Sequence, residues 1–227
     1  DLIQTYCYAN QEVTGCQQVR LINKKIVWRG SEYDELLCTP VNEGLFELKD
    51  VTIGINFHWE RKENQRFKGG LKFIVENGKL TAINLVSVED YLVSVISSEM
   101  SATASLELLK AHAVISRSWL LAQQLGNQKT VTPQLHASSA QKTDAEEHIV
   151  WYERDAHTNF DVCADDHCQR YQSVTRANTD VVMQAVKVTS GEVLKYEDTI
   201  CDARFSKCCG GVLEEFQNCW DDVKYDY

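Results

Sequence analysis

Residues Val88 to Gln123 read VEDYLVSVISSEMSATASLELLKAHAVISRSWLLAQ, and this stretch decides the fold. Apolar residues recur at helical spacing from Glu89 to Ile96, which predicts an amphipathic helix. Leu106 to Leu125 is apolar on nearly all faces, which is typical of a buried helix. Ser105 can cap this second helix, because its hydroxyl can accept a hydrogen bond from a backbone N–H of the first turn. We therefore predict a second helix that is central to the core.

Strand signals lie on both sides of the helices. The pair Asn77-Gly78 separates two apolar runs and predicts a tight hairpin, because both residues tolerate positive φ. A polar, irregular excursion from Gln128 to Asp161 follows the helices. The predicted strands are Phe46 to Phe57, Leu71 to Val86, Val181 to Val188, Glu192 to Tyr196 and Thr199 to Phe205. The expected fold class is α+β, with antiparallel strands packed around a central buried helix.

Length and charge limit the function classes. With 227 residues the chain can bury a good core, and 33 acidic against 23 basic residues give a formal charge of −10. Nucleic acid binding needs clustered Lys and Arg, so we expect no nucleic acid partner. The sequence has no apolar run that could span a bilayer and no visible signal peptide. Because it begins with Asp1, we expect a mature or trimmed fragment whose anchor, if one exists, has been removed.

Glu99 is the main candidate for chemistry. Val95, Ile96 and Met100 flank it, and a carboxylate desolvated by apolar neighbours is driven towards its neutral form. Such a group can hold a proton near neutral pH and act as a general acid. The alternative is a glutamate that caps or pairs near a helix end.

Four nitrogen and sulfur donors occur within twelve residues in HTNFDVCADDHC: His157, Cys163, His167 and Cys168. This set matches the tetrahedral Cys₂His₂ preference of Zn²⁺. A metal closed by four protein ligands keeps no open position for water, so we expect one structural zinc per chain that pins the excursion to the core. The alternative is a short disulfide between the two cysteines, with both histidines on the surface.

The other seven cysteines are odd in number and cannot all pair within the chain. Cys7 with Cys16 is plausible by proximity, and Cys208 or Cys209 could pair with Cys201 or Cys219, but sequence does not give connectivity. Buried free thiols are the alternative. Nine cysteines in all fit metal ligation or an oxidising compartment.

Several blocks together resemble the sporulation stage II protein D (SpoIID) family, also called the amidase-enhancer domain. They are EDYL, SEM and LELLKAHAVISRSWLLAQ, with RFKGGLKFIVENGKLTAINLVSVEDYL upstream and HTNFDVCADDHCQRY, TSGEVLKYEDTICDARFSKCCGG and GVLEEF downstream. The resemblance covers roughly Phe67 to Trp220. We predict a family-like catalytic domain over residues 45–227 and an N-terminal extension or insertion of unknown role over residues 1–44.

The resemblance implies a lytic transglycosylase that cleaves bonds between N-acetylmuramic acid (MurNAc) and N-acetylglucosamine (GlcNAc) in peptidoglycan glycan strands, including strands without stem peptides. Glu99 would be its acid/base, the four Cys and His residues would bind zinc, and the location would be extracytoplasmic. The family's other name, amidase-enhancer domain, implies an alternative function. In that case the chain would be a non-catalytic wall-binding module that activates an amidase.

Other substrate-binding candidates have structural alternatives. The guanidinium of Arg117 lies in an apolar helical run and could orient Glu99, but tying down a loop is the favoured role. Ser98 and Tyr171 could contact sugar, although capping and core packing are commoner uses. Gly210 and Gly211 resemble a groove-lining block or merely form a turn. Lys207-Cys208 stands where the family usually has small polar residues, and this departure weakens the assignment of the family's residue roles to this block.

Overall fold

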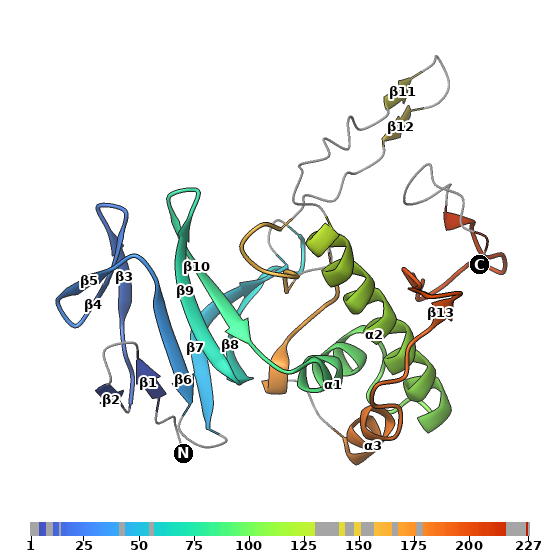
Figure 1. Ribbon diagram of the computed structural model, residues 1–227, viewed down its shortest axis with the longest axis horizontal. Coiled ribbons are helices and arrows are strands. Elements are labelled where there is room, and N and C mark those ends of the chain that lie inside the picture. Colours follow the sequence, from blue (N-terminus) through green and yellow to red (C-terminus); the bar gives the residue numbers. More distant parts are fainter. Residues whose placement is uncertain are drawn as a thin grey trace.

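The computed structural model describes residues 5–7, 11–13, 15–40, 44–54, 57–129, 141–143, 148–150, 157–164, 168–175, 179–216 and 226. This part of the chain forms antiparallel sheets and three α-helices, which confirms the predicted α+β class. Figure 1 shows most strands on one side of the molecule and the helices on the other. Among the described residues, no helix is both long enough and apolar enough to cross a membrane.

The largest sheet has the strand order β10-β9-β6-β1-β2. Its strands are β1 (Thr5–Cys7), β2 (Gln11–Val13), β6 (Leu36–Pro40), β9 (Gly70–Glu76) and β10 (Lys79–Leu85). Leu36 of β6 lies opposite Phe73 of β9, so strands from both sides of residue 44 share one sheet. The division into residues 1–44 and 45–227 stays a prediction.

A three-stranded sheet packs beside it, formed by β3 (Val19–Ile22), β4 (Lys25–Trp28) and β5 (Ser31–Tyr33). Burial alternates along β4, so Ile26 and Trp28 point inwards. They form a small core with Leu36 and Phe73 from the large sheet. Because successive side chains of a strand point to opposite faces, one face of β4 packs against the large sheet.

A second hairpin leads towards the helices. Strands β7 (Leu45–Ile53) and β8 (Arg61–Lys68) pair antiparallel, so β7 ends before the predicted limit at Phe57. Phe46 and Phe67 stack with ring centroids 5.1 Å apart and join the main core.

The predicted turn at Asn77-Gly78 is confirmed. Both residues have positive φ, 50° and 72°, between the paired strands β9 and β10. Positive φ at both central turn residues matches the twist of the flanking strands.

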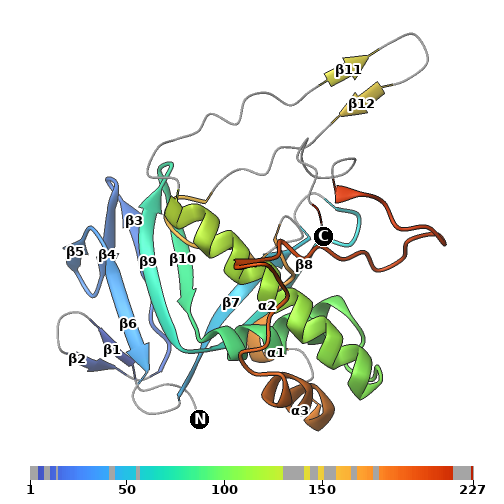
Figure 2. The same cartoon turned by 45° about the vertical axis from the view of Figure 1, so that its right-hand side comes forward.

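The two predicted helices are also confirmed. Helix α1 (Val88–Glu99) begins after Ser87, whose hydroxyl accepts a hydrogen bond from Asp90 N–H. Helix α2 (Leu106–Lys129) begins after Ser105, whose hydroxyl accepts from Leu108 N–H at 3.4 Å. Figure 2 shows α2 as a long helix beside α1 and α3. Its buried side chains are Leu109, His112, Ala113, Ser116, Arg117, Ser118, Trp119 and Leu120.

The predicted strand over Val181 to Val188 is wrong, because this segment forms helix α3 (Asp180–Val188). Its valines resemble a strand, but Val182, Ala185 and Val186 are buried on one face at helical spacing. Thr179 caps the helix by accepting a hydrogen bond from Val182 N–H. Packing against α1 and α2 and a good cap outweigh the weak strand propensity of valine.

The remaining elements are short. The predicted C-terminal strands shrink to β13 (Lys195–Tyr196) and β14 (Thr199–Ile200), which form one small hairpin. A 3₁₀ turn, η1 (Ser173–Thr175), lies against β8 and α1. Within the predicted excursion, β11 (Gln141–Thr143) pairs with β12 (His148–Val150), and most of its other residues lie outside the described ranges.

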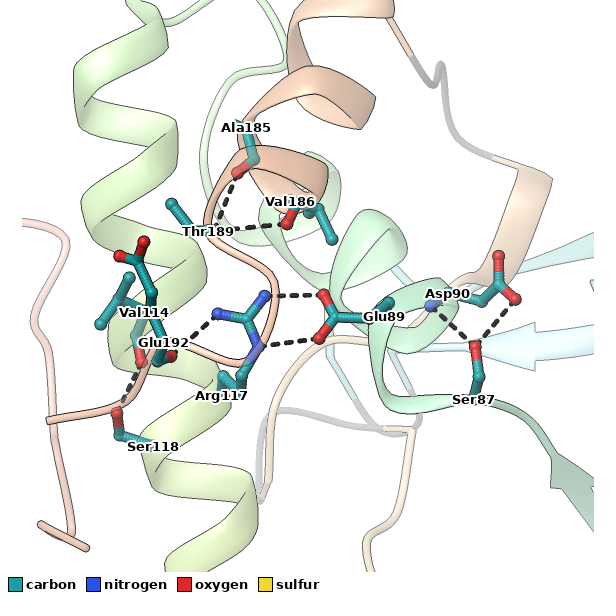
Figure 3. A network of polar contacts seen from close by, with 10 residues as sticks. All are labelled: Ser87, Glu89, Asp90, Val114, Arg117, Ser118, Ala185, Val186, Thr189 and Glu192. Carbon is teal, nitrogen blue, oxygen red and sulfur yellow. Dashed lines mark hydrogen bonds and ion pairs between the residues drawn. The ribbon is translucent and has the colours of Figure 1, made fainter.

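Arg117 joins the helices through a buried polar network (Figure 3). Its guanidinium donates to both carboxylate oxygens of Glu89, at 3.0 and 2.7 Å, and to the carbonyl of Glu192 at 3.1 Å. The Arg117 side chain is 2% exposed. Nearby, the Ser118 hydroxyl donates to Val114 O and accepts from Leu194 N–H. Helix α2 is thereby tied to the start of α1 and to the segment after α3.

We expect Arg117→Ala to lower the free energy of unfolding by about 3 kcal/mol, because it leaves the Glu192 carbonyl and Glu89 without their partner. Lys110→Ala is the matched control on the same helix, since its ion pair with Glu107 is exposed and should change stability by less than about 0.5 kcal/mol. Urea unfolding measures both. Equal losses in the two variants would contradict a central role for the buried pair.

Candidate active site

Glu99 is the last residue of α1 and is half-buried. Its Oε1 accepts a hydrogen bond from the backbone N–H of Arg170 at 2.7 Å. Within the described residues, Oε2 has no hydrogen-bond partner. One carboxylate oxygen is thus held by the backbone, and the other is available to a ligand.

The segment that holds Glu99 runs along α1. Gln172 N–H donates to the Ser94 hydroxyl at 2.9 Å, two residues beyond the Arg170 contact. Tyr171 stacks on Tyr91 with ring centroids 5.1 Å apart and donates its hydroxyl proton to Asn84 Oδ1 at 2.6 Å. Burial raises the pKa of Tyr171 to about 12. The Tyr171 ring is therefore a core element in this structure.

Two buried polar atoms without described partners accompany this segment. They are the Ser98 hydroxyl oxygen and the Gln169 side-chain nitrogen, and Gln169 Oε1 accepts from the Tyr91 hydroxyl at 3.3 Å. Ser98 and Gln169 are direct sequence neighbours of Glu99 and Arg170. Buried polar groups are usually paired, so atoms left open beside a carboxylate suit a ligand or water.

Three of the four predicted metal ligands lie together. Donor atoms of His157, Cys163 and Cys168 are all within 4.8 Å of one another, and His157 Nε2 is 3.4 Å from Cys168 Sγ. The two cysteine sulfurs are not joined to each other. His167 lies outside the described residues. Cys168, the last residue of the cluster, comes two residues before Arg170, whose backbone N–H donates to Glu99.

The other predicted residues lie elsewhere. Arg117 binds Glu89 and Glu192, as described above, rather than Glu99. Gly210 and Gly211 are exposed, and a Cβ at either would meet no atom within 4 Å. Sequence reasoning did not select Arg170, because a backbone donor carries no side-chain signature.

A hollow of about 370 Å³ lies near the opposite end of α1 and is lined in part by Lys68, Glu89, Asp90 and Met183. Its acidic groups already have partners, since Glu89 binds Arg117 and Asp90 binds Lys68 at 2.9 Å. Burial opposes ionisation of Asp90, but hydrogen bonds from Lys68 and Ser87 outweigh it and lower the pKa of Asp90. Both carboxylates are therefore paired with basic side chains.

Cys16, Cys201, Cys208 and Cys209, which lie outside the cluster, have free thiols. The suggested disulfides Cys7 with Cys16, and Cys201 with Cys208 or Cys209, are therefore wrong. Cys201 is buried, which agrees with the alternative of a buried thiol, and the other three are exposed. Cys219 lies outside the described residues.

Residues 76–196 match the SpoIID (Stage II sporulation protein) family, which is just over half of the chain. The chain belongs to this family. Membership indicates a role related to the bacterial cell wall. The matched range includes Glu99, Arg117, Tyr171 and the cysteine-histidine cluster, but it ends before Gly210 and Gly211.

The chain is also similar to an uncharacterised protein of Brachyspira hyodysenteriae, with 27% identity over 235 residues. The alignment covers 94% of this chain and 56% of that relative, so the chain spans little more than half of its length. The search of solved structures found no match.

His112 is a buried titratable group on α2 that sequence analysis did not select. It is 3% exposed, and neither ring nitrogen has a hydrogen-bond partner among the described residues. Its ring meets Phe205 edge-on, with centroids 4.7 Å apart. Burial lowers the pKa of His112 from 6.5 to about 4.

We expect this histidine to make the protein sensitive to mild acid. Between pH 6.5 and 4 the unfolded chain binds a proton here that the folded chain does not, so stability falls as pH falls. The parent should lose unfolding free energy between pH 7 and pH 5, and in His112→Leu this loss should be smaller by about 2 kcal/mol. Urea unfolding at both pH values measures it. His58→Leu, at an exposed position, is the control, and an equal effect there would contradict the assignment.

Proposed function

We propose that the protein is a peptidoglycan lytic transglycosylase with Glu99 as its single acid/base. The observation that carries the proposal is the hydrogen bond from Arg170 N–H to Glu99 Oε1, with Oε2 left available. A fixed carboxylate with one open oxygen suits proton transfer, because a general acid must lie within hydrogen-bond reach of its target. Membership of the SpoIID family supports a substrate in the cell wall.

One carboxylate is enough for this reaction. Ordinary glycosidases use a pair of carboxyl groups, the second serving as base or nucleophile. In a lytic transglycosylase the 6-hydroxyl of MurNAc attacks its own anomeric carbon. Glu99 first donates its proton to the glycosidic oxygen as the bond to GlcNAc breaks. The resulting carboxylate then accepts the proton of the 6-hydroxyl, which leaves a 1,6-anhydro end and restores the acid without consuming water.

We further propose that His157, Cys163, Cys168 and His167 hold one Zn²⁺. The three described donors are a nitrogen and two sulfurs close enough to share one ion, and this donor set suits zinc. When bound, the metal would crosslink the chain around His157 to the chain around Cys168. It would take no part in the reaction. Cys168 would then fix the start of the chain that leads to Arg170, so the cluster would position the N–H that holds Glu99.

Because peptidoglycan lies outside the cytoplasmic membrane, we also propose an extracytoplasmic location. Peptidoglycan glycan strands, including strands without stem peptides, are the proposed substrate, and a cell-wall amidase acting on the same wall is a proposed partner.

We expect Glu99→Gln to abolish cleavage of purified glycan strands and to leave folding and metal content unchanged. Glutamine keeps the size and the acceptor oxygen for Arg170 N–H but has no proton to transfer. Mass spectrometry of the products, from strands with and without stem peptides, is the measurement. Glu107→Gln, at an exposed glutamate in the first turn of α2, is the control for a general loss of carboxylate charge.

We expect the parent to produce glycan fragments whose ends are one water lighter than hydrolytic ends. These fragments should be absent from the Glu99→Gln reaction. Ordinary reducing ends that depend on Glu99 would indicate a hydrolase instead. No cleavage of any strand by the parent would favour the wall-binding, amidase-activating reading.

For the metal, elemental analysis should find about one zinc per chain, and Cys163→Ser should reduce it sharply. Because metal binding is coupled to folding, Cys163→Ser should also lower the melting temperature. Cys208→Ser, at an exposed free thiol, is the matched control and should keep zinc and stability. A metal-free parent with full stability would overturn the zinc proposal.

A further inference from the structure

Two aromatic side chains lie in the turn between β7 and β8, upstream of the range matched by the family. The rings of Phe57 and Trp59 stack with centroids 5.3 Å apart and an angle of 15° between their planes. Phe57 is 52% exposed, and Trp59 is partly buried. Single exposed apolar side chains are common, but here the exposed ring is stacked on a second aromatic ring, so the two rings together present one apolar surface.

This aromatic pair is linked to Glu99 through one residue. The guanidinium carbon of Arg170 lies 5.5 Å from the centroid of a Trp59 ring, which is cation–π distance. The backbone N–H of the same arginine donates to Glu99 Oε1 at 2.7 Å. Arg170 therefore contacts the acid through its backbone and the Trp59 ring through its side chain.

The turn is built to hold Trp59 in place. Gly54 has φ +69°, and a Cβ there would lie 2.2 Å from Trp59 Cζ3, so the indole sits directly on the Gly54 backbone. Phe57 N–H donates to Gly54 O and Glu60 N–H donates to Phe57 O, both at 3.0 Å. A side chain fixed in this way loses little entropy on binding a ligand.

A pyranose ring fits these groups chemically. Its axial C–H bonds give it an apolar face that can stack on an aromatic ring, and its hydroxyls can accept hydrogen bonds from a guanidinium. The guanidinium of Arg170 contacts the Trp59 ring and carries five N–H donors that can bind sugar hydroxyls. Two rings are too small a patch for a stable protein interface, which favours a sugar over a protein partner.

We propose that Phe57, Trp59 and Arg170 form a sugar-binding subsite that holds a pyranose ring of the glycan strand beside the bond that Glu99 cleaves. The inference rests on the proposed function and adds to it a binding subsite whose two aromatic residues lie outside the family's matched range. Phe57 and Trp59 bind by stacking and take no part in proton transfer.

The test measures binding separately from cleavage. In the Glu99→Gln protein, calorimetry gives the Kd for a peptide-free tetrasaccharide of alternating GlcNAc and MurNAc. Phe57→Ala and Trp59→Ala should each weaken binding about tenfold, and Trp59→Phe should recover most of the loss. Tyr33→Ala, an aromatic truncation in the three-stranded sheet, is the control and should leave the Kd unchanged.

With Glu99 intact, Phe57→Ala should raise KM about tenfold and leave kcat nearly unchanged, because stacking acts equally on substrate and transition state. Since its ring is exposed, Phe57→Ala should fold normally even if Trp59→Ala does not. Gly54→Ala should weaken binding in the same direction by displacing the indole.

A parent that cleaves strands, with an unchanged Kd and KM in Phe57→Ala, would overturn the subsite and leave the proposed function intact. A parent that neither binds nor cleaves any strand would overturn both.

Discussion

The arrangement of the helices depends on one buried interaction, the bidentate pair between Arg117 and Glu89. A buried guanidinium is costly unless it is paired, and here a carboxylate and the Glu192 carbonyl together accept three hydrogen bonds from it. The pair fixes the first turn of α1 against the middle of α2 and holds the segment after α3. Glu99 lies in the last turn of the same helix whose first turn this pair anchors.

The second constraint is the segment that runs along α1 from Cys168 to Ser173. It makes backbone hydrogen bonds to Glu99 and Ser94, and between them Tyr171 is buried against Tyr91. A cysteine-histidine cluster stands directly before it in the chain. Cluster, segment and acid therefore form one continuous structure, so a change in the cluster is expected to reach Glu99 through the backbone rather than through direct contact.

Sequence patterns predicted the elements whose signals are local. Ser105 is a cap, Asn77-Gly78 is a turn, and the apolar residues of α1 follow helical spacing, so these features need only near neighbours. The α3 helix was missed because its valines favour a strand locally and only packing on α1 and α2 reverses that preference. The suggested disulfides failed for a related reason: short spacing in sequence does not make two sulfurs meet in space.

The sequence by itself determined the α+β class, the two helices on either side of residue 100, the family, and Glu99 with the cysteine-histidine group as the candidate site residues. It could do so because these features depend on residue type and short spacing. Only the tertiary structure decided that Arg117 faces Glu89 rather than Glu99, that Arg170 holds Glu99 by its backbone, and that Trp59 lies beside Arg170. Those contacts join residues 28, 71 and 111 positions apart, and such distances are closed only when the whole core packs.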